Sequence, residues 1–128
     1  MSTPCTILVV DDDPLIRELL SLHLRNAGYS VVLAEDAVAA GRCMLRQPPD
    51  LMLLDIDMPY MSGLEFFNVL SNDTRLPRFP VVFLTANAEG REFAVRRGAA
   101  GYLAKPVLLP ELLREVARHL PGARIPLS

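Results

Sequence analysis

Cysteine is scarce in this sequence, and the features of exported and membrane proteins are missing. Cys5 and Cys43 are too few for a disulfide framework and lack the spacing of metal ligands. The N-terminus has no basic stretch followed by an apolar run, and no apolar run approaches the ~20 residues of a membrane span. These absences predict a cytoplasmic protein with reduced thiols and no membrane contact.

An excess of positive charge is also lacking. The chain has 13 Lys and Arg residues against 15 Asp and Glu residues, which gives a net charge of −2 and a pI near 5.6. This balance argues against direct nucleic-acid binding, and no helix-turn-helix pattern accompanies it. Twelve of the basic residues are Arg. The single lysine, Lys105 beside Pro106, is therefore a candidate functional residue.

What the sequence does contain is a regular alternation of short apolar runs and amphipathic stretches. Its 128 residues are a typical length for one domain. The apolar runs predict β-strands at 6–10, 30–34, 51–54, 80–84 and 101–104. The amphipathic stretches predict helices at 14–27, 37–46, 64–70, 88–97 and 110–120.

The predicted elements define one α/β domain. The first helix should begin with Asp13 as its cap and Pro14 in its first turn, and its apolar face should include Leu19 and Leu20. Five strand–helix units in strict alternation predict a parallel sheet with helices on both faces. We assign residues 1–120 to this domain and residues 121–128 to a C-terminal tail or linker stub.

Polar residues gather where the predicted strands end. These residues are Asp11, Asp12 and Asp13 after the first strand, Asp55 and Asp57 after the third, Thr85 after the fourth, and Lys105 after the fifth. Because the carboxyl ends of parallel strands lie along one edge of a sheet, these side chains should converge there.

The expected cluster has the components of phosphoryl transfer. Neighbouring carboxylates repel one another, and a small hard cation such as Mg²⁺ relieves that repulsion. Asp11, Asp12 and Asp55 supply the ligand type that Mg²⁺ prefers. An ionised carboxylate is also a nucleophile towards phosphorus, and Thr85 and Lys105 could stabilise the phosphoryl oxygens.

Four segments resemble the receiver domain of two-component response regulators, in its chemotaxis-regulator-like form. They are ILVVDDDP at 7–14, LLDIDMPYMSG at 53–63, VVFLTA at 81–86 and GYLAKP at 101–106. The similarity extends over residues 6–120. It implies a flavodoxin-like, doubly wound (βα)5 sandwich whose five-stranded parallel sheet has the order 2-1-3-4-5.

The resemblance also implies a role for each residue of the cluster. Asp55 corresponds to the phosphoacceptor. Asp12 corresponds to a direct Mg²⁺ ligand, Asp11 to a ligand acting largely through water, and Asp57 to a ligand through its backbone carbonyl; Mn²⁺ is an alternative ion. Lys105 corresponds to the residue that pairs with the phosphoryl group, ahead of a cis peptide bond to Pro106. Thr85 and Tyr102 correspond to the conformational switch pair.

The partners implied by the resemblance are proteins. The phosphodonor should be a sensor histidine kinase or a histidine phosphotransfer protein, and a downstream protein or output domain should read the change in shape. A phosphorylation-dependent homodimer stays an open alternative. The expected protein is a signalling phosphoacceptor with self-catalysed phosphotransfer and autodephosphorylation, not a conventional enzyme.

Two departures from the family pattern and two alternative functions accompany this interpretation. The stretch from Thr85 to Gly98 is slightly short, which leaves the usual partner geometry open, and Asp57 and Asn87 flank the expected phosphoryl position. One alternative is a receiver-like docking module that is not phosphorylated. The other is a haloacid-dehalogenase-type phosphatase, which also phosphorylates an Asp but places its acidic pair last along the chain, whereas here the pair comes first.

Overall fold

A single parallel sheet forms the centre of the molecule. The computed structural model describes residues 4–87 and 89–120, and its five strands follow the order β2-β1-β3-β4-β5. The strands are β1 Thr6–Val10, β2 Ser30–Ala34, β3 Leu51–Asp55, β4 Val81–Thr85 and β5 Gly101–Ala104. The helices are α1 Pro14–Asn26, α2 Ala37–Arg46, α3 Gly63–Asn72, α4 Glu89–Arg96 and α5 Leu109–His119. The predicted fold class and strand order are confirmed.

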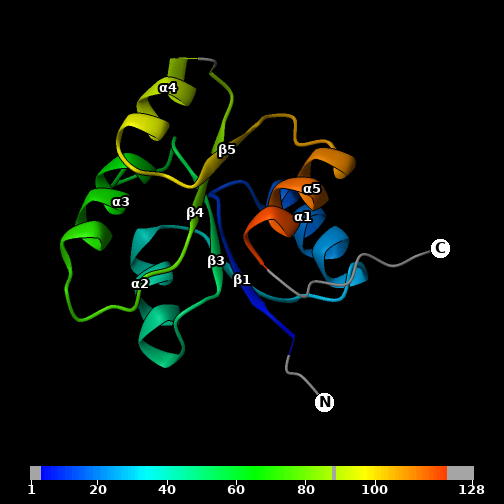
Figure 1. Ribbon diagram of the computed structural model, residues 1–128, viewed down its shortest axis with the longest axis horizontal. Coiled ribbons are helices and arrows are strands. Elements are labelled where there is room, and N and C mark those ends of the chain that lie inside the picture. The colour runs from blue at the N-terminus through cyan, green and yellow to red at the C-terminus, as the bar shows by residue number, and fades with distance from the viewer. Residues whose placement is uncertain (1–3, 88, 121–128) are drawn as a thin grey trace.

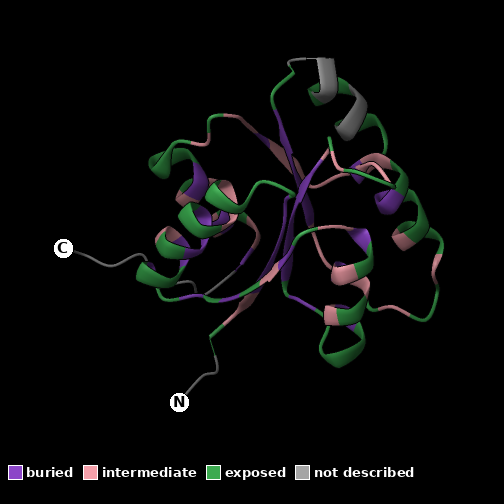
Figure 2. Cartoon of the chain, turned by 180° about the vertical axis from the view of Figure 1, so that it is seen from behind, coloured by how far each residue is buried: buried purple, intermediate pink, exposed green. Residues whose placement is uncertain are grey.

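The helices form a layer on each side of the sheet. Helices α1 and α5 cover one face, and α2, α3 and α4 cover the other (Figure 1). Alternate residues of a strand enter different cores: Ile7 packs with Leu24 of α1 and Val116 of α5, whereas Leu8 packs with Phe66 of α3. The central strands are therefore buried on both faces (Figure 2), which explains why they are continuous apolar runs without polar alternation.

Local signals place the helix starts. Asp13 accepts a hydrogen bond from the Leu15 N–H, so the predicted cap of α1 is confirmed. Asp36 and Ser62 cap α2 and α3 in the same way. Helix α3 is longer than the predicted 64–70, because the Ser62 cap lets it begin at Gly63 and it continues to Asn72.

One predicted core residue of α1 is wrong. Leu19 is 49% exposed, whereas Leu20 and Leu24 are buried. The two buried residues are one helical turn apart and face the sheet, and Leu19 is rotated away from them by the helical step. Within the described residues, none of the helices has the length and apolar character needed to traverse a bilayer. The tail predicted at 121–128 lies outside these residues.

Candidate functional site

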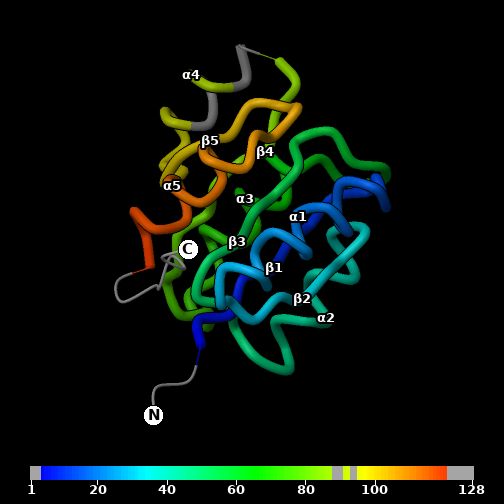
Figure 3. The backbone as a smooth tube through the Cα atoms, turned by 90° about the vertical axis from the view of Figure 1, so that its right-hand side faces the viewer, coloured from blue at the N-terminus to red at the C-terminus, as the bar shows by residue number. Residues whose placement is uncertain are grey.

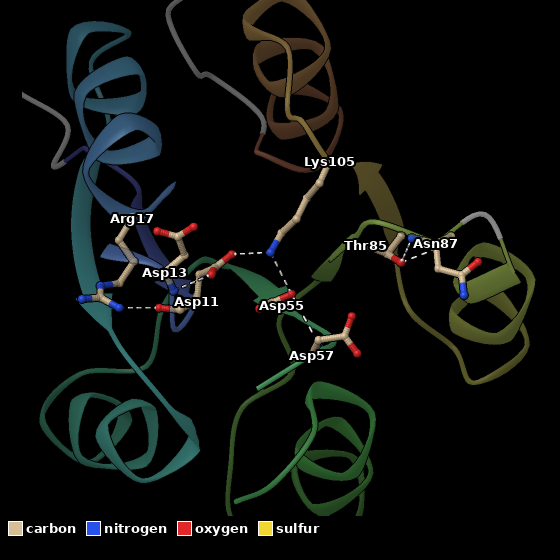
Figure 4. Close-up of polar contacts among 8 residues, drawn as sticks. All are labelled: Asp11, Asp13, Arg17, Asp55, Asp57, Thr85, Asn87 and Lys105. Atoms are coloured by element: carbon tan, nitrogen blue, oxygen red, sulfur yellow. Dashed lines mark hydrogen bonds and ion pairs between the residues drawn. The ribbon is translucent and has the colours of Figure 1, made fainter. Parts of the chain in front are cut away.

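The carboxyl ends of the strands bring the predicted polar residues to one edge. Strand pairing aligns Asp55 of β3 with Leu84, and Thr85 of β4 with Ala104. Asp11 directly follows β1 and Lys105 directly follows β5. The strands lie side by side in the tube view of the backbone (Figure 3), and the close-up shows Asp11, Asp55 and Lys105 meeting at the edge of the sheet (Figure 4). The convergence predicted from the alternation of strands and helices is present.

Lys105 joins the two buried carboxylates. Its Nζ atom lies 2.9 Å from Asp11 Oδ2 and 3.0 Å from Asp55 Oδ1. Asp11 is fully buried, and Asp55 is 2% exposed. The Lys105 N–H donates to the Thr85 carbonyl at 2.8 Å, and the Lys105–Pro106 peptide bond is cis, as the resemblance implies. The backbone of β5 thus directs the only lysine towards the acids.

Burial dominates the electrostatics of Asp55. It raises the pKa of Asp55 from 3.8 to about 7; the hydrogen bond from Lys105 opposes this rise and the charge of Asp11 adds to it. Burial alone would lower the pKa of Lys105, but its hydrogen bonds and ion pairs with Asp11 and Asp55 outweigh burial and raise that pKa. Burial thus favours the neutral form of Asp55 although Lys105 lies beside it.

The same acids could hold a metal ion. Asp11, Asp12 and Asp55 each offer a carboxylate oxygen, and these oxygens lie within 4.8 Å of one another. Asp55 Oδ2 is buried and has no hydrogen-bond partner among the described residues, whereas Asp12 is exposed. A cation would satisfy the unpaired oxygen and offset the repulsion between the acids, and exposed Asp12 gives it access from solvent. The residues present thus fit a metal site.

Backbone contacts fix Asp11 in place. Its Oδ1 accepts from the Asp13 N–H at 2.9 Å, and its carbonyl accepts from Arg17 Nη1 at 2.6 Å. Arg17 was not among the predicted site residues. Its acceptor is a main-chain carbonyl, so no side-chain pattern could have indicated this contact.

Thr85 and Tyr102 each have a partner that the sequence did not indicate. The Thr85 hydroxyl donates to the Asn87 carbonyl and accepts from the Asn87 N–H, both at 3.0 Å. It is therefore engaged with its own loop (Figure 4). The guanidinium of Arg91 lies over the half-buried Tyr102 ring, 4.8 Å from its centroid. Helix α4 thus contacts β5 through this pair.

The loop after Asp55 is held tightly against β3. A Cβ atom on Gly63 would lie 2.1 Å from the Asp55 carbonyl oxygen, so only glycine fits there. The Asp57 N–H donates to Asp55 Oδ1 at 3.3 Å, while the side chain of Asp57 is exposed. Met58 and Met61 are partly buried and pack against the core on the α3 side of the sheet.

An unusual backbone geometry occurs at the tip of this loop. Tyr60 has φ 70°, the only positive φ of a non-glycine residue in the described part of the chain. The Met61 N–H donates to the Pro59 carbonyl at 2.8 Å, which closes a γ-turn around Tyr60. For an aromatic residue this conformation costs ~1–3 kcal/mol. The sequence predicted only a loop here, without this turn.

Comparison with known proteins agrees with the geometry. The family model of the response regulator receiver domain matches residues 7–117. The chain is 37% identical over 112 residues to the probable transcriptional regulatory protein TcrX of Mycobacterium tuberculosis, covering 86% of this chain and 47% of TcrX. It is 39% identical over 115 residues to an uncharacterised 14.6 kDa protein of Leptolyngbya boryana, covering 88% of each.

A solved structure shows the same architecture. The chemotaxis response regulator CheY4 of Vibrio cholerae superposes with a TM-score of 0.84 and 32% identity, covering 92% of this chain and 100% of CheY4. The chain spans less than half the length of several curated relatives, TcrX among them. These matches favour the receiver interpretation over the phosphatase alternative. The chain belongs to the response regulator receiver domain family.

Proposed function

We propose that Asp55 is the phosphoacceptor of this receiver domain. The observation that supports this most strongly is the placement of a buried carboxylate between an ammonium group and two further acids at the edge of the sheet. A bound Mg²⁺, or Mn²⁺ in its place, would be held by Asp11, Asp12, Asp55 and the Asp57 carbonyl, and would neutralise phosphoryl oxygens.

The proposed reaction is a transfer from phosphohistidine. An oxygen of ionised Asp55 attacks phosphorus, the P–O bond forms as the P–N bond breaks, and the leaving imidazole takes up a proton. Lys105 is 3.0 Å from Asp55 Oδ1, within reach of a phosphoryl group on that carboxylate. Burial raises the pKa of Asp55 and so disfavours its ionised, nucleophilic form. Positive charge added near Asp55 would lower this pKa and favour the ionised form.

The proposed output is a shift between two conformations. To bond a phosphoryl oxygen, the Thr85 hydroxyl must leave Asn87, and Tyr102 would then turn towards the space that Thr85 vacates. The donor would be a sensor histidine kinase or histidine phosphotransfer protein, and a downstream partner, output domain or second copy would read the change. We place the domain, residues 1–120, in the cytoplasm, in keeping with its free cysteines.

Phosphotransfer to Asp55 tests this function directly. Candidate histidine kinases, autophosphorylated with radiolabelled ATP, should label the wild-type chain in the presence of Mg²⁺, and phosphoramidate should modify it without a kinase. The Asp55→Ala variant should take up no label from either donor. Mass spectrometry of peptides should place the modification at Asp55. Label that persists in Asp55→Ala, or no modification of the wild type, would contradict the assignment and favour an unphosphorylated docking module.

We predict that Asp57 tunes the lifetime of the phosphorylated state. Its exposed carboxylate is close to Asp55 in sequence and its N–H reaches Asp55 Oδ1, so its charge acts where water must approach the phosphoryl group. Asp57→Asn should change the rate of autodephosphorylation by about three- to tenfold, since ~1 kcal/mol in a barrier changes a rate about fivefold. The decay of label after removal of the donor measures this rate. An unchanged rate would dispose of the hypothesis.

A further inference from the structure

Tyr60 is a large aromatic residue that the fold itself does not require. Tyr60 is 97% exposed, and its side chain has no hydrogen bond or ring contact within the described residues. Its backbone has φ 70°, a conformation that glycine or asparagine adopts at lower cost. Neither packing nor backbone geometry therefore explains a tyrosine at this position. Strain of this kind concentrates at functional sites.

The loop presents Tyr60 rigidly. Pro59 has a fixed φ, Met58 and Met61 on either side are partly buried and pack against the core, and Gly63 fits against the Asp55 carbonyl. Tyrosine itself has few rotatable bonds, so little conformational freedom is lost when a partner covers it. An exposed, pre-oriented aromatic side chain has the properties of an interface hot spot.

Its position points to one partner. The loop bearing Tyr60 begins directly after Asp55, which lies at the carboxyl end of β3 and is 2% exposed. A protein that brings a phosphohistidine to Asp55 must cover this edge of the sheet. Leu15, 77% exposed in the first turn of α1, follows the acids of β1 along the chain, and its N–H bonds Asp13 Oδ1. Exposed apolar residues thus follow closely along the chain after the acids at the ends of both β1 and β3.

We infer that Tyr60 is a specificity-determining contact for the phosphodonor protein, on the strength of its exposure, its strained γ-turn and its place in the phosphoacceptor loop. The inference rests on the proposed function. Tyr60 has no part in the transfer chemistry itself, so a small donor that needs no docking surface should not sense it.

Comparing a protein donor with a small-molecule donor separates a docking role of Tyr60 from a role in the transfer chemistry. The protein donor is the autophosphorylated kinase fragment that labels the wild-type chain fastest in the survey described above, and the small donor is phosphoramidate. Tyr60→Gly should lower kcat/KM for the kinase fragment about tenfold or more, as expected for loss of an aromatic anchor, and change the phosphoramidate rate less than twofold. Tyr60→Phe should retain most of the kinase rate.

The variants also check the fold. Tyr60→Gly should raise Tm, because glycine suits the positive φ, so a slower kinase reaction could not be attributed to unfolding. Leu45→Ala, which truncates an 87% exposed residue in the last turn of α2, should leave both rates unchanged. An equal fall with both donors, or no fall with the kinase fragment, would overturn the inference; the latter result would assign Tyr60 to another partner. Failure of both the kinase fragment and phosphoramidate to modify wild-type Asp55 would instead refute the proposed function.

Discussion

Replacing Lys105 by methionine should lower the free energy of unfolding by about 3–5 kcal/mol near pH 8 without Mg²⁺, the usual cost of removing one partner from a buried charge pair. Lys105 is the cation found between two acids that are buried almost completely. Because the pKa of Lys105 is raised in the folded state, its stabilising contribution is fully present below its ordinary pKa of 10.5 and is lost only above the raised value. The loss on substitution should therefore be complete near pH 8.

Urea denaturation with and without millimolar Mg²⁺ measures this effect. Mg²⁺ should restore much of the stability, because a second cation can take over the neutralisation of Asp11 and Asp55. The double variant Asp55→Asn/Lys105→Met should be more stable than Lys105→Met alone, because one of the two unpaired carboxylates is gone. Arg75→Met is the matched control: Arg75 pairs with Asp73 on the surface, where water screens the two charges, so its loss should leave stability nearly unchanged. Equal losses for the two single variants would contradict the assigned role of Lys105.

Most of this site could be predicted from the sequence because the chain alternates regularly between strands and helices. Each strand is a continuous apolar run, so the first polar residue after it marks the edge of the sheet, and Asp11, Asp55, Thr85 and Lys105 were located in this way. Because the strands pair in parallel, their carboxyl ends lie along the same edge of the sheet. The capping role of Asp13 could also be predicted, because it depends only on neighbouring residues: an acid directly before a proline and an apolar stretch usually begins a helix.

Contacts that depend on tertiary geometry could not be predicted. Arg17 bonds a carbonyl, and Arg91 reaches a ring on another element, so neither leaves a pattern of spacing in the sequence. The positive φ of Tyr60 could not be predicted either, because tyrosine rarely adopts this conformation. Leu19 shows the limit of periodicity, since two adjacent leucines in a helix cannot both face the sheet and only the packed structure selects Leu20.

Metal-free protein should become less stable as the pH rises from about 4 to about 7, relative to the Asp55→Asn variant. Burial raises the pKa of Asp55 from 3.8 to about 7 in the folded state, so within this window the folded chain retains a proton that the unfolded chain has released. Stability falls with pH wherever the folded state binds more protons. The accumulated loss should be on the order of 2–4 kcal/mol and should level off above about pH 7.

Mg²⁺ should reverse this trend, because a metal competes with the proton for the same carboxylates. Its stabilising effect should be small near pH 5 and large near pH 8, as measured by urea denaturation in EDTA and in millimolar Mg²⁺. Asp55→Asn should lack both the pH-dependent loss and most of the Mg²⁺ effect. Asp57→Asn, which removes an exposed carboxylate from the same loop, should keep the pH-dependent loss. If wild type and Asp55→Asn change in parallel with pH, burial of the Asp55 charge does not govern the stability of this site.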